Sequence, residues 1–359
     1  MKKTVLALAA LAASSAAFAQ SSVTLYGVVD ASVESVTGSH SLTRVSSDNL
    51  ATTRIGFKGV EDLGGGLKAN FVLESAVKSD TGAFGDTNRA FSRAAWVGLS
   101  GGFGEVRLGR QDSLIGAQIA NTIGAQAYDE SVVAQTLGGS SSAYRRLDNA
   151  VTYFAPKFVQ GLTLGVQYTT AADQIGATKN SETGLHQPVG RGFGLVAEYA
   201  NGPLGAGLSY IAIKAANGAD LTGKADNTAV YAYGSYDFGL AKVTGYYDQD
   251  KQDVAQRDRR QVYGVKVAVP VVTNVTVTPG FAYVRNATTA AGTFSSGVDN
   301  DNAKILTLKA QYDLSKRTAL YGLYTAVYND NNTNLGLSGV TTTAGKGARG
   351  IAVGVRHAF

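Results

Sequence analysis

The sequence predicts an all-β protein, a transmembrane antiparallel β-barrel of about sixteen strands. Three observations lead to this prediction. Short segments whose hydrophobicity alternates with period two are joined in turn by short turns and by long polar connections. The composition, with 44 glycines, 18 tyrosines and five prolines, suits strands and tight turns. The mean hydropathy is −0.02, as expected when outward apolar and inward polar residues cancel along each strand.

The amino-terminal segment has the three parts of a secretory signal peptide. It begins Met1-Lys2-Lys3, continues through an apolar stretch, and reaches the small-residue site Ala17-Phe18-Ala19. This order predicts a signal peptide over residues 1–19 rather than a short buried helix. Cleavage before Gln20 would leave 340 of the 359 residues (359 − 19 = 340) as one barrel domain, residues 20–359. No later apolar run approaches the ~20 residues of a spanning helix.

Cysteine content and charge exclude two classes of protein. The chain has no cysteine, so a small extracellular module built on disulfides is excluded, whereas a periplasmic protein or a barrel is not. The formal charge is +5, and it falls to about +3 when the two lysines of the signal peptide are removed. This charge is too small and too dispersed to indicate a nucleic-acid partner.

The first strand is expected at Val23–Val36. Val23, Leu25 and Val29 share one face, while Asp30 and Glu34 share the other. At about fourteen residues this strand is longer than most strands of globular proteins and suits a tilted crossing of a bilayer.

The remaining strands follow the same pattern, although tyrosines on both faces leave the orientation of two of them open (Thr228–Asp237 and Thr318–Tyr328). They are expected at Thr52–Val60, Leu67–Ser75, Asn88–Leu99, Gly104–Arg110, Arg146–Phe154, Leu162–Thr169, Phe193–Tyr199, Leu204–Ile213, Thr228–Asp237, Ala241–Asp248, Arg260–Val269, Val275–Arg285, Ala303–Tyr312, Thr318–Tyr328 and Ala348–Phe359. Seven short turns alternate with eight long connections. A barrel threaded through a membrane requires this parity, with the short turns and both chain ends on the periplasmic side.

The longest connection, residues 111–145, interrupts the alternating pattern. In hydrocarbon every backbone polar group needs an internal partner, so the sheet must close on itself. Sixteen strands enclose an aqueous lumen too wide for side chains to fill. Long unstructured connections in compact proteins are usually functional or disordered. We therefore expect residues 111–145 to fold into the lumen as a constriction loop that carries Asp112, Asp129 and Glu130.

Basic side chains on the polar faces of the strands are the candidate lining of the constriction. Arg54 shares a face with Lys58, and Arg93 and Arg146 are assigned to inward faces of their strands. Facing charges of opposite sign across a narrow gap bias which ions pass. The predicted constriction consists of Arg54, Lys58, Arg93 and Arg146 on the wall, and Asp129 and Glu130 on the loop.

Two other residues are expected on the outer wall. Counting from an inward Arg93 places Trp96 outward, as a membrane-interface or subunit-contact residue. Arg110 shares the outward face of Val106 and Leu108. A lone arginine there would be costly in lipid, so Arg110 is expected at a subunit contact or at the rim.

Among the residues expected to face the lumen, eleven are basic and seven are acidic, so the net charge of the lumen favours anions. The bases are Arg54, Lys58, Lys68, Arg93, Arg107, Arg146, Lys242, Arg260, Lys266, Lys309 and Arg356. The acids are Asp30, Glu34, Glu74, Glu105, Asp148, Glu198 and Asp248. Because ions screen charges beyond about 8 Å at physiological salt, the sequence predicts a modest anion preference.

Several segments resemble the Gram-negative general outer-membrane porins of the betaproteobacterial and neisserial type. They are Ser22–Asp30, Arg54–Gly59, Glu61–Leu67, Ala95–Leu99, Leu108–Gln111, Arg146–Asn149 and Gly354–Phe359. The resemblance implies a homotrimer of sixteen-stranded barrels in the outer membrane, each with a third loop that constricts the pore. It also implies that Arg54, Arg93 and Arg146 line the constriction, and that Phe359 is the signal read by the barrel assembly machinery. The Pro-Glu-Phe sequence of many third loops is absent here, so Asp129 and Glu130 are assigned by position.

The expected function is a water-filled channel for passive diffusion of ions and small hydrophilic solutes, embedded in outer-membrane lipid, with no cofactor and no metal. The alternative is a substrate-selective channel for an organic anion or a sugar. An outer-membrane lipase is disfavoured because His40, His186 and His357 lack a neighbouring serine and acid. The segment Asp299–Asn302 lacks the glutamate of a calcium loop. A secreted β-sandwich adhesin would not need the observed parity of turns and loops.

Overall fold

The computed structural model describes most of the predicted mature chain. The predicted signal peptide, residues 1–19, lies outside the described part. In the described part, no helix is both long and apolar enough to cross a membrane. The described residues are 22–124, 126–129, 145–170, 190–217, 220–252, 258–287 and 301–359.

The described elements are almost all antiparallel strands, with one helix after the sixth strand. They are β1 (Ser22–Thr37), β2 (Ser41–Ser47), β3 (Arg54–Gly64), β4 (Leu67–Ala76), β5 (Ala94–Gly101), β6 (Gly104–Asp112), α2 (Leu114–Thr122), β7 (Arg146–Phe154), β8 (Leu162–Thr169), β9 (Gly192–Asn201), β10 (Leu204–Asn217), β11 (Asp220–Asp237), β12 (Lys242–Gln252), β13 (Asp258–Val272), β14 (Val275–Arg285), β15 (Ala303–Asp313), β16 (Thr318–Asn329) and β17 (Ala348–Ala358).

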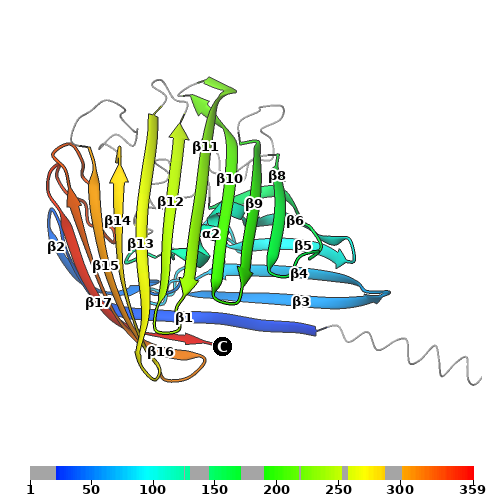
Figure 1. The fold of residues 1–359 in the computed structure, drawn as a ribbon, viewed down its shortest axis with the longest axis horizontal. Coiled ribbons are helices and arrows are strands. Elements are labelled where there is room, and N and C mark those ends of the chain that lie inside the picture. Colours follow the sequence, from blue (N-terminus) through cyan, green and yellow to red (C-terminus); the bar gives the residue numbers. More distant parts are fainter. Residues whose placement is uncertain are drawn as a thin grey trace, which may run out of the picture.

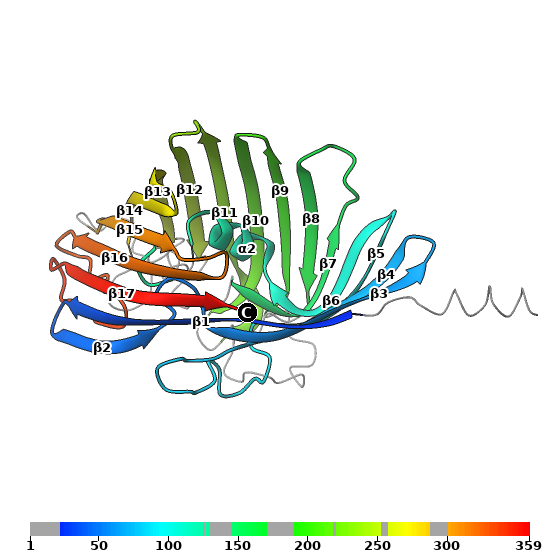
Figure 2. The same ribbon diagram turned by 90° about the horizontal axis from the view of Figure 1, so that it is seen from below.

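The strands close into a ring. From β3 to β17, each strand pairs antiparallel with the next one along the chain, and β17 returns to pair with β1. The other edge of β1 pairs with β3 in its first half and with β2 in its second half. The strands β2 and β3 therefore share one place in the wall, and the predicted sixteen-stranded barrel is confirmed. In Figure 1 the carboxyl terminus and the turns that join β9 to β10 and β11 to β12 lie at the lower end of the drawing, and Figure 2 shows the strands from below.

Several strands differ from the predicted ones, and three of the differences are large. The polar stretch after β1 contains the additional strand β2, which follows β1 back by direct pairing. The strand β5 begins at Ala94 rather than Asn88. The hairpin of β10 and β11 continues beyond the predicted ends, so that Ala215 pairs with Ala225. The stretches that form β2 and the extension of the β10–β11 hairpin are polar, which is why they were predicted as loops, but backbone pairing does not require an apolar face.

The two faces of β1 agree with the prediction. Val23 and Leu25 are 67% and 52% exposed, whereas Asp30 and Glu34 are buried. The final strand has the same arrangement, with Ile351 exposed on the outer face. The outside of the ring is therefore apolar, as the hydrocarbon of a bilayer requires.

The inner face is less polar than predicted in part of the barrel. Ile211, Ile213 and Tyr231 of β10 and β11 face inward and are fully buried. They belong to the same apolar cluster as Ile115 and Ile119 of α2. The inward positions of these strands are apolar because they pack against the helix rather than against water.

The carboxyl terminus completes the seam of the ring. The backbone N–H of Phe359 donates to the carbonyl of Gly27 at 3.1 Å, and the Gly27 N–H donates in return at 3.2 Å. A Cβ on Gly27 would overlap both the Phe359 ring and the carbonyl oxygen of Arg54. Glycine is therefore required here by space, because the last aromatic ring lies over the first strand.

We predict that Gly27→Ala destabilises the barrel by about 1–3 kcal/mol, the usual effect of overpacking. Unheated electrophoresis across a temperature series should show the folded band lost at a lower temperature. The matched control is Gly322→Ala in β16, where an added Cβ meets no atom within 4 Å. Equal melting of the two variants would contradict the seam contact.

Candidate functional site

The described residues after β6, 113–124 and 126–129, are called the segment, and they begin with a capped helix. The Ser113 hydroxyl accepts a hydrogen bond from the Gly116 N–H at 2.9 Å, which caps α2 at its amino end. The helix packs against β8 to β11 (Figure 2). Gln118 lies against Gly207 of β10, and Thr122 accepts a hydrogen bond from the Tyr231 hydroxyl of β11 at 2.9 Å. These contacts attach one end of the segment to the inner face of β10 and β11.

The other end of the segment is attached to a different part of the ring. The Tyr128 hydroxyl donates to Glu34 of β1 at 3.0 Å, and the Thr325 hydroxyl of β16 donates to the Tyr128 carbonyl at 2.9 Å. The strands β1 and β16 are several strands away from β10 in both directions around the ring. Residues 113–124 and 126–129 therefore contact two separated groups of strands.

Glu34 is the centre of this second attachment. Its buried carboxylate also accepts hydrogen bonds from Arg44 at 2.6 Å, Asn49 at 3.2 Å and Ser338 at 2.9 Å. Burial and the negative charge of Glu34 raise the pKa of Tyr128, so its hydroxyl remains a donor. Several hydrogen bonds to one buried carboxylate compensate for its desolvation.

The first charged cluster contains two arginines and one glutamate. Arg93 donates to one oxygen of Glu74, and the Tyr26 hydroxyl donates to the other at 2.9 Å. The Arg54 Nε lies 3.9 Å from that second oxygen. Two guanidinium groups therefore share a single carboxylate, leaving a formal surplus of one positive charge.

The second charged cluster repeats the arrangement where β6 ends and β7 begins. The Asp112 carboxylate lies 3.0 Å from the Arg146 Nε and 3.9 Å from the Arg145 Nε. Both arginine side chains remain about one-fifth exposed, at 18% and 21%. Together the two clusters contain four arginines and two carboxylates, a formal charge of +2 (4 − 2).

The other predicted constriction residues lie near these clusters or on the attached segment. Lys58 faces inward and lies 5.1 Å from the centre of the Tyr26 ring. Asp129 lies 3.9 Å from the Lys309 Nζ of β15. Glu130 lies outside the described residues. The structure thus places Lys58 next to the first cluster and Asp129 beside β15.

The predicted outward orientation of Trp96 is wrong. Trp96 pairs with Val72, which pairs with the inward Lys58, while the neighbouring Val97 is 56% exposed on the outer face. The prediction counted alternate residues from Arg93, but the strand begins only at Ala94. Trp96 is therefore an inner-wall residue and contacts neither lipid nor a subunit across the outer wall.

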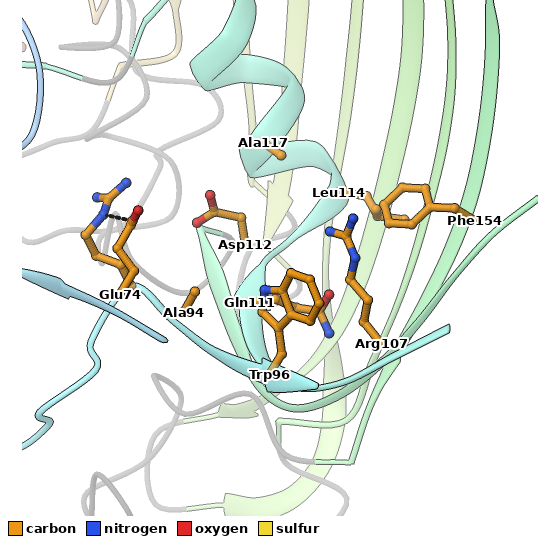
Figure 3. A pocket seen from close by; sticks show the side chains of 10 residues that line it. Glu74, Ala94, Trp96, Arg107, Gln111, Asp112, Leu114, Ala117 and Phe154 are labelled. Atoms are coloured by element: carbon orange, nitrogen blue, oxygen red, sulfur yellow. Dashed lines mark hydrogen bonds and ion pairs between the residues drawn. The ribbon is translucent and has the colours of Figure 1, made fainter. Parts of the chain in front are cut away.

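Trp96 lines a cavity of about 200 Å³ on the inner wall. The Arg107 guanidinium lies 4.5 Å from the Trp96 ring centre and 4.9 Å from the Phe154 ring centre, which are cation–π contacts. Glu74 and Asp112 line the opposite side of the cavity (Figure 3). The cavity therefore joins aromatic faces, a cation and the carboxylates of both charged clusters.

Arg110 lies on the outward face, as predicted from Val106 and Leu108. It pairs with Ala95, whose face is outward, and its guanidinium is bound to the Asp148 carboxylate and to the Ser92 carbonyl at 2.8 Å. Its charge is thus compensated within the chain. The predicted inward position of Asp148 is wrong, because a β-bulge opposite Arg110 shifts the alternation of β7.

Arg145 and Tyr128 are two site residues that the sequence did not single out. Arg145 precedes β7 and lies outside the alternation from which inward charges were assigned. The only sequence feature that could have indicated Arg145 as a site residue is its position next to Arg146, at the end of the long connection. Tyr128 stands directly before Asp129, but its attachment to Glu34 is 94 residues away in sequence and no local pattern reveals it.

A closed antiparallel ring, apolar outside and charged inside, defines a channel-forming transmembrane β-barrel. The family model described as "Gram-negative porin" matches residues 5–332, and the chain belongs to that family. The protein is accordingly a multi-pass outer-membrane channel protein of a Gram-negative bacterium. Both the family and the fold are those of a channel rather than of an enzyme.

Similar proteins cover the chain from end to end. Outer membrane porin protein 32 of Delftia acidovorans is 34% identical over 377 residues, with all of both chains covered. Major outer membrane protein P.IB of Neisseria lactamica is 27% identical over 381 residues, again with all of both chains covered. The solved structure of an anion-selective porin from Comamonas acidovorans is 31% identical, has a TM-score of 0.77, and covers 95% of this chain and 100% of that chain.

We predict that Tyr128→Phe loosens the attached segment. The substitution removes one donor from the buried Glu34, a change of about 1–3 kcal/mol, and keeps the ring in place. Single-channel recordings should show greater open-channel current noise than for the unmodified protein. Tyr236→Phe is the control, because it removes the same atom from an exposed outer-wall tyrosine. Equal noise in both variants would contradict the attachment.

Proposed function

We propose that the protein forms a water-filled channel for passive diffusion of ions and small hydrophilic solutes, with a modest preference for anions and no catalytic step. The observation that carries the preference is the sharing of two carboxylates by four arginines. A surplus of positive charge beside a narrow passage raises the local concentration of anions. The similarity to an anion-selective porin supports this sign of the preference.

The narrow passage in this proposal is made by residues 113–129. Their contacts with β10 and β11 on one side, and with β1 and β16 on the other, support a position across the lumen. Arg54, Lys58, Arg93 and Arg146 would line the wall at this level, with Asp129 and Glu130 on the segment. A passage fixed by buried hydrogen bonds keeps its diameter, so that charge rather than loop motion sets the ion preference.

We further propose a homotrimer in the outer-membrane lipid, assembled by the outer-membrane barrel assembly machinery. Arg110 and its partner Asp148 support a protein contact on the outer wall, since charged groups there are unfavourable in lipid even when paired. The Phe359 ring supports a role as assembly signal, because it remains 43% exposed although its backbone is paired with Gly27.

We predict that replacing the three wall arginines reverses the local charge and abolishes the anion preference. The triple variant Arg54→Gln, Arg93→Gln, Arg146→Gln changes the formal charge of the two clusters from +2 to −1 (1 − 2). The ratio of anion to cation permeability, measured in planar bilayers, should fall to one or below. Removal of three guanidinium groups should also widen the passage and increase conductance.

The matched control removes three positive charges at the short-turn end of the barrel. Lys157, Lys316 and Arg317 are exposed there, away from both clusters. Lys157→Gln, Lys316→Gln, Arg317→Gln should retain the permeability ratio of the unmodified protein. If the wall variant also retained that ratio, the arginines would not be the selectivity filter.

A second candidate function, selective passage of an organic anion, is favoured by the cavity beside Trp96. A planar carboxylate with an aromatic ring could stack on Trp96 while its charge approaches Arg107 and Arg93. Stacking on an aromatic side chain contributes about 1 kcal/mol beyond buried area. The inner wall also carries the neighbouring rings of Tyr231, Tyr233 and Tyr246, whose centroids lie 6.2 and 6.3 Å apart. These rings pack in or against the apolar cluster that contains Ile115 and Ile119 of α2.

We predict that benzoate inhibits the chloride current more strongly than acetate, and that Trp96→Ala reduces this inhibition roughly fivefold. Trp96→Phe is the matched control, because it keeps an aromatic face and should keep most of the inhibition. Equal inhibition by benzoate and acetate in the unmodified protein would exclude the aromatic subsite and leave the general channel unaffected.

A further inference from the structure

The outer wall carries a row of cations at the upper ends of four neighbouring strands. We name Lys251, Arg259, Arg285 and Lys304, from β12, β13, β14 and β15, the cationic belt. Lys251 pairs directly with Arg259, and Lys304 pairs with Tyr283, two residues before Arg285. Arg259, Arg285 and Lys304 are exposed, and Lys251 is half-buried.

The register shows that the belt faces outward. The residues next to Lys251 and Arg259 in sequence are Asp250 and Arg260, which are buried and bound to each other on the inner face. Because side chains alternate along a strand, Lys251 and Arg259 must point away from the lumen. The belt is therefore separated from the pore by the thickness of the wall.

A row of tyrosines lies nearer the middle of the same strands. Tyr247 and Tyr263 are four residues from Lys251 and Arg259 along β12 and β13, and Tyr283 is paired with Lys304. Tyr247 pairs with Tyr263, which pairs with Tyr283, and the first two rings are 5.2 Å apart between centroids. Below these tyrosines the outward positions become apolar, as at Val265 and Phe281. Tyrosines of this kind lie at the boundary between hydrocarbon and headgroups. The belt thus lies at the level of the lipid headgroups.

No carboxylate compensates the belt in the described part of the chain. None of its four cations forms an ion pair with a described residue. The outward positions of the described part of β12 to β15 contain no Asp or Glu. The belt differs in this respect from Arg54, Arg93, Arg145 and Arg146, each of which lies within 4 Å of a carboxylate.

We propose that the cationic belt binds the phosphate groups of anionic lipids in the outer leaflet of the membrane. The long-connection end of the barrel faces the outside of the cell, so the belt meets the headgroups of that leaflet. Lysine and arginine side chains extend along an apolar wall to reach anionic headgroups. Arginine binds phosphate oxygens through paired N–H groups, which adds geometric specificity to the charge attraction.

A lipid accounts for the belt better than a second copy of the chain. A copy packed against β12 to β15 through the same face would need carboxylates opposite the cations, and that face offers none in its described part. The succession from apolar side chains through tyrosines to cations follows the depth profile of a lipid leaflet. The proposal depends only on the outer wall, so it is independent of the proposed ion preference.

The test compares lipid binding by two variants of equal charge. The belt variant is Arg259→Gln, Arg285→Gln, Lys304→Gln, and the control is Lys157→Gln, Lys316→Gln, Arg317→Gln. The full mature protein, folded in neutral detergent micelles, is titrated with fluorescent lipid A carrying two phosphates and with the same lipid after dephosphorylation. Circular dichroism and the heat-dependent gel shift check that each variant is folded.

The unmodified protein and the control should bind the phosphorylated lipid more tightly than the dephosphorylated one. The belt variant should bind the phosphorylated lipid more weakly by a factor on the order of one hundred, from the usual contribution of each basic residue near an anionic surface. Its single-channel conductance should be unchanged, because the belt lies outside the lumen. If the belt variant fails to fold, Lys304→Gln alone should weaken binding about fivefold.

Three results would overturn the proposal. Equal losses in the belt variant and the control would mean that net charge, not position, determines binding. Equal binding of both lipids by the unmodified protein would mean that phosphate is not recognised. Unchanged lipid binding by the belt variant would mean that the belt does not bind lipid. If cross-linking of the subunits were lost at the same time, the belt would contact protein instead.

Discussion

The structure depends on the need of every backbone N–H and C=O group for a partner when water is absent. A sheet meets this requirement in hydrocarbon only by closing on itself, which makes the seam between the first and the last strand essential. Here the seam is made by pairing of β1 with β17 and is completed by Phe359 opposite Gly27. Once the ring is closed, alternation gives each strand one face toward lipid and one toward the interior. The hollow interior follows from the number of strands rather than from any single side chain.

The interior is organised by carboxylates that each hold several groups together. Glu74 and Asp112 each lie between two arginines, so that like charges are held close together while a positive surplus remains. Glu34 receives hydrogen bonds from separate parts of the chain, among them Arg44 and Tyr128. Buried carboxylates are costly unless several donors surround them. The same carboxylates that hold the segment and the arginines in place therefore determine the electrostatic character of the interior.

The sequence predicted the fold and part of the site because both follow from local alternation. The faces of β1, the inward positions of Arg54 and Lys58, and the ring of sixteen strands were all readable from period-two hydrophobicity. The inward or outward position predicted from alternation was wrong where the regular strand geometry is interrupted. Trp96 was assigned to the wrong face because β5 starts at Ala94, and Asp148 because a bulge and the positive φ of Asn149 (50°) shift β7.

Contacts between distant parts of the chain left no pattern in the sequence. The buried Ile211 faces the interior although an aqueous lumen favours polar residues, because α2 packs against it. The attachment of Tyr128 to Glu34, and the sharing of Asp112 by Arg145 and Arg146, likewise depend on the three-dimensional path of the segment. Sequence reasoning identified the participating charges but not how they are combined.

The zero-current potential of the unmodified protein across a planar bilayer, measured under a KCl gradient at rising ionic strength, tests the central claim most directly. The surplus of arginines over carboxylates predicts a potential with the sign of chloride permeation, largest in dilute salt and declining as the screening length shortens. A potential with the sign of potassium permeation, or one independent of salt concentration, would contradict the account.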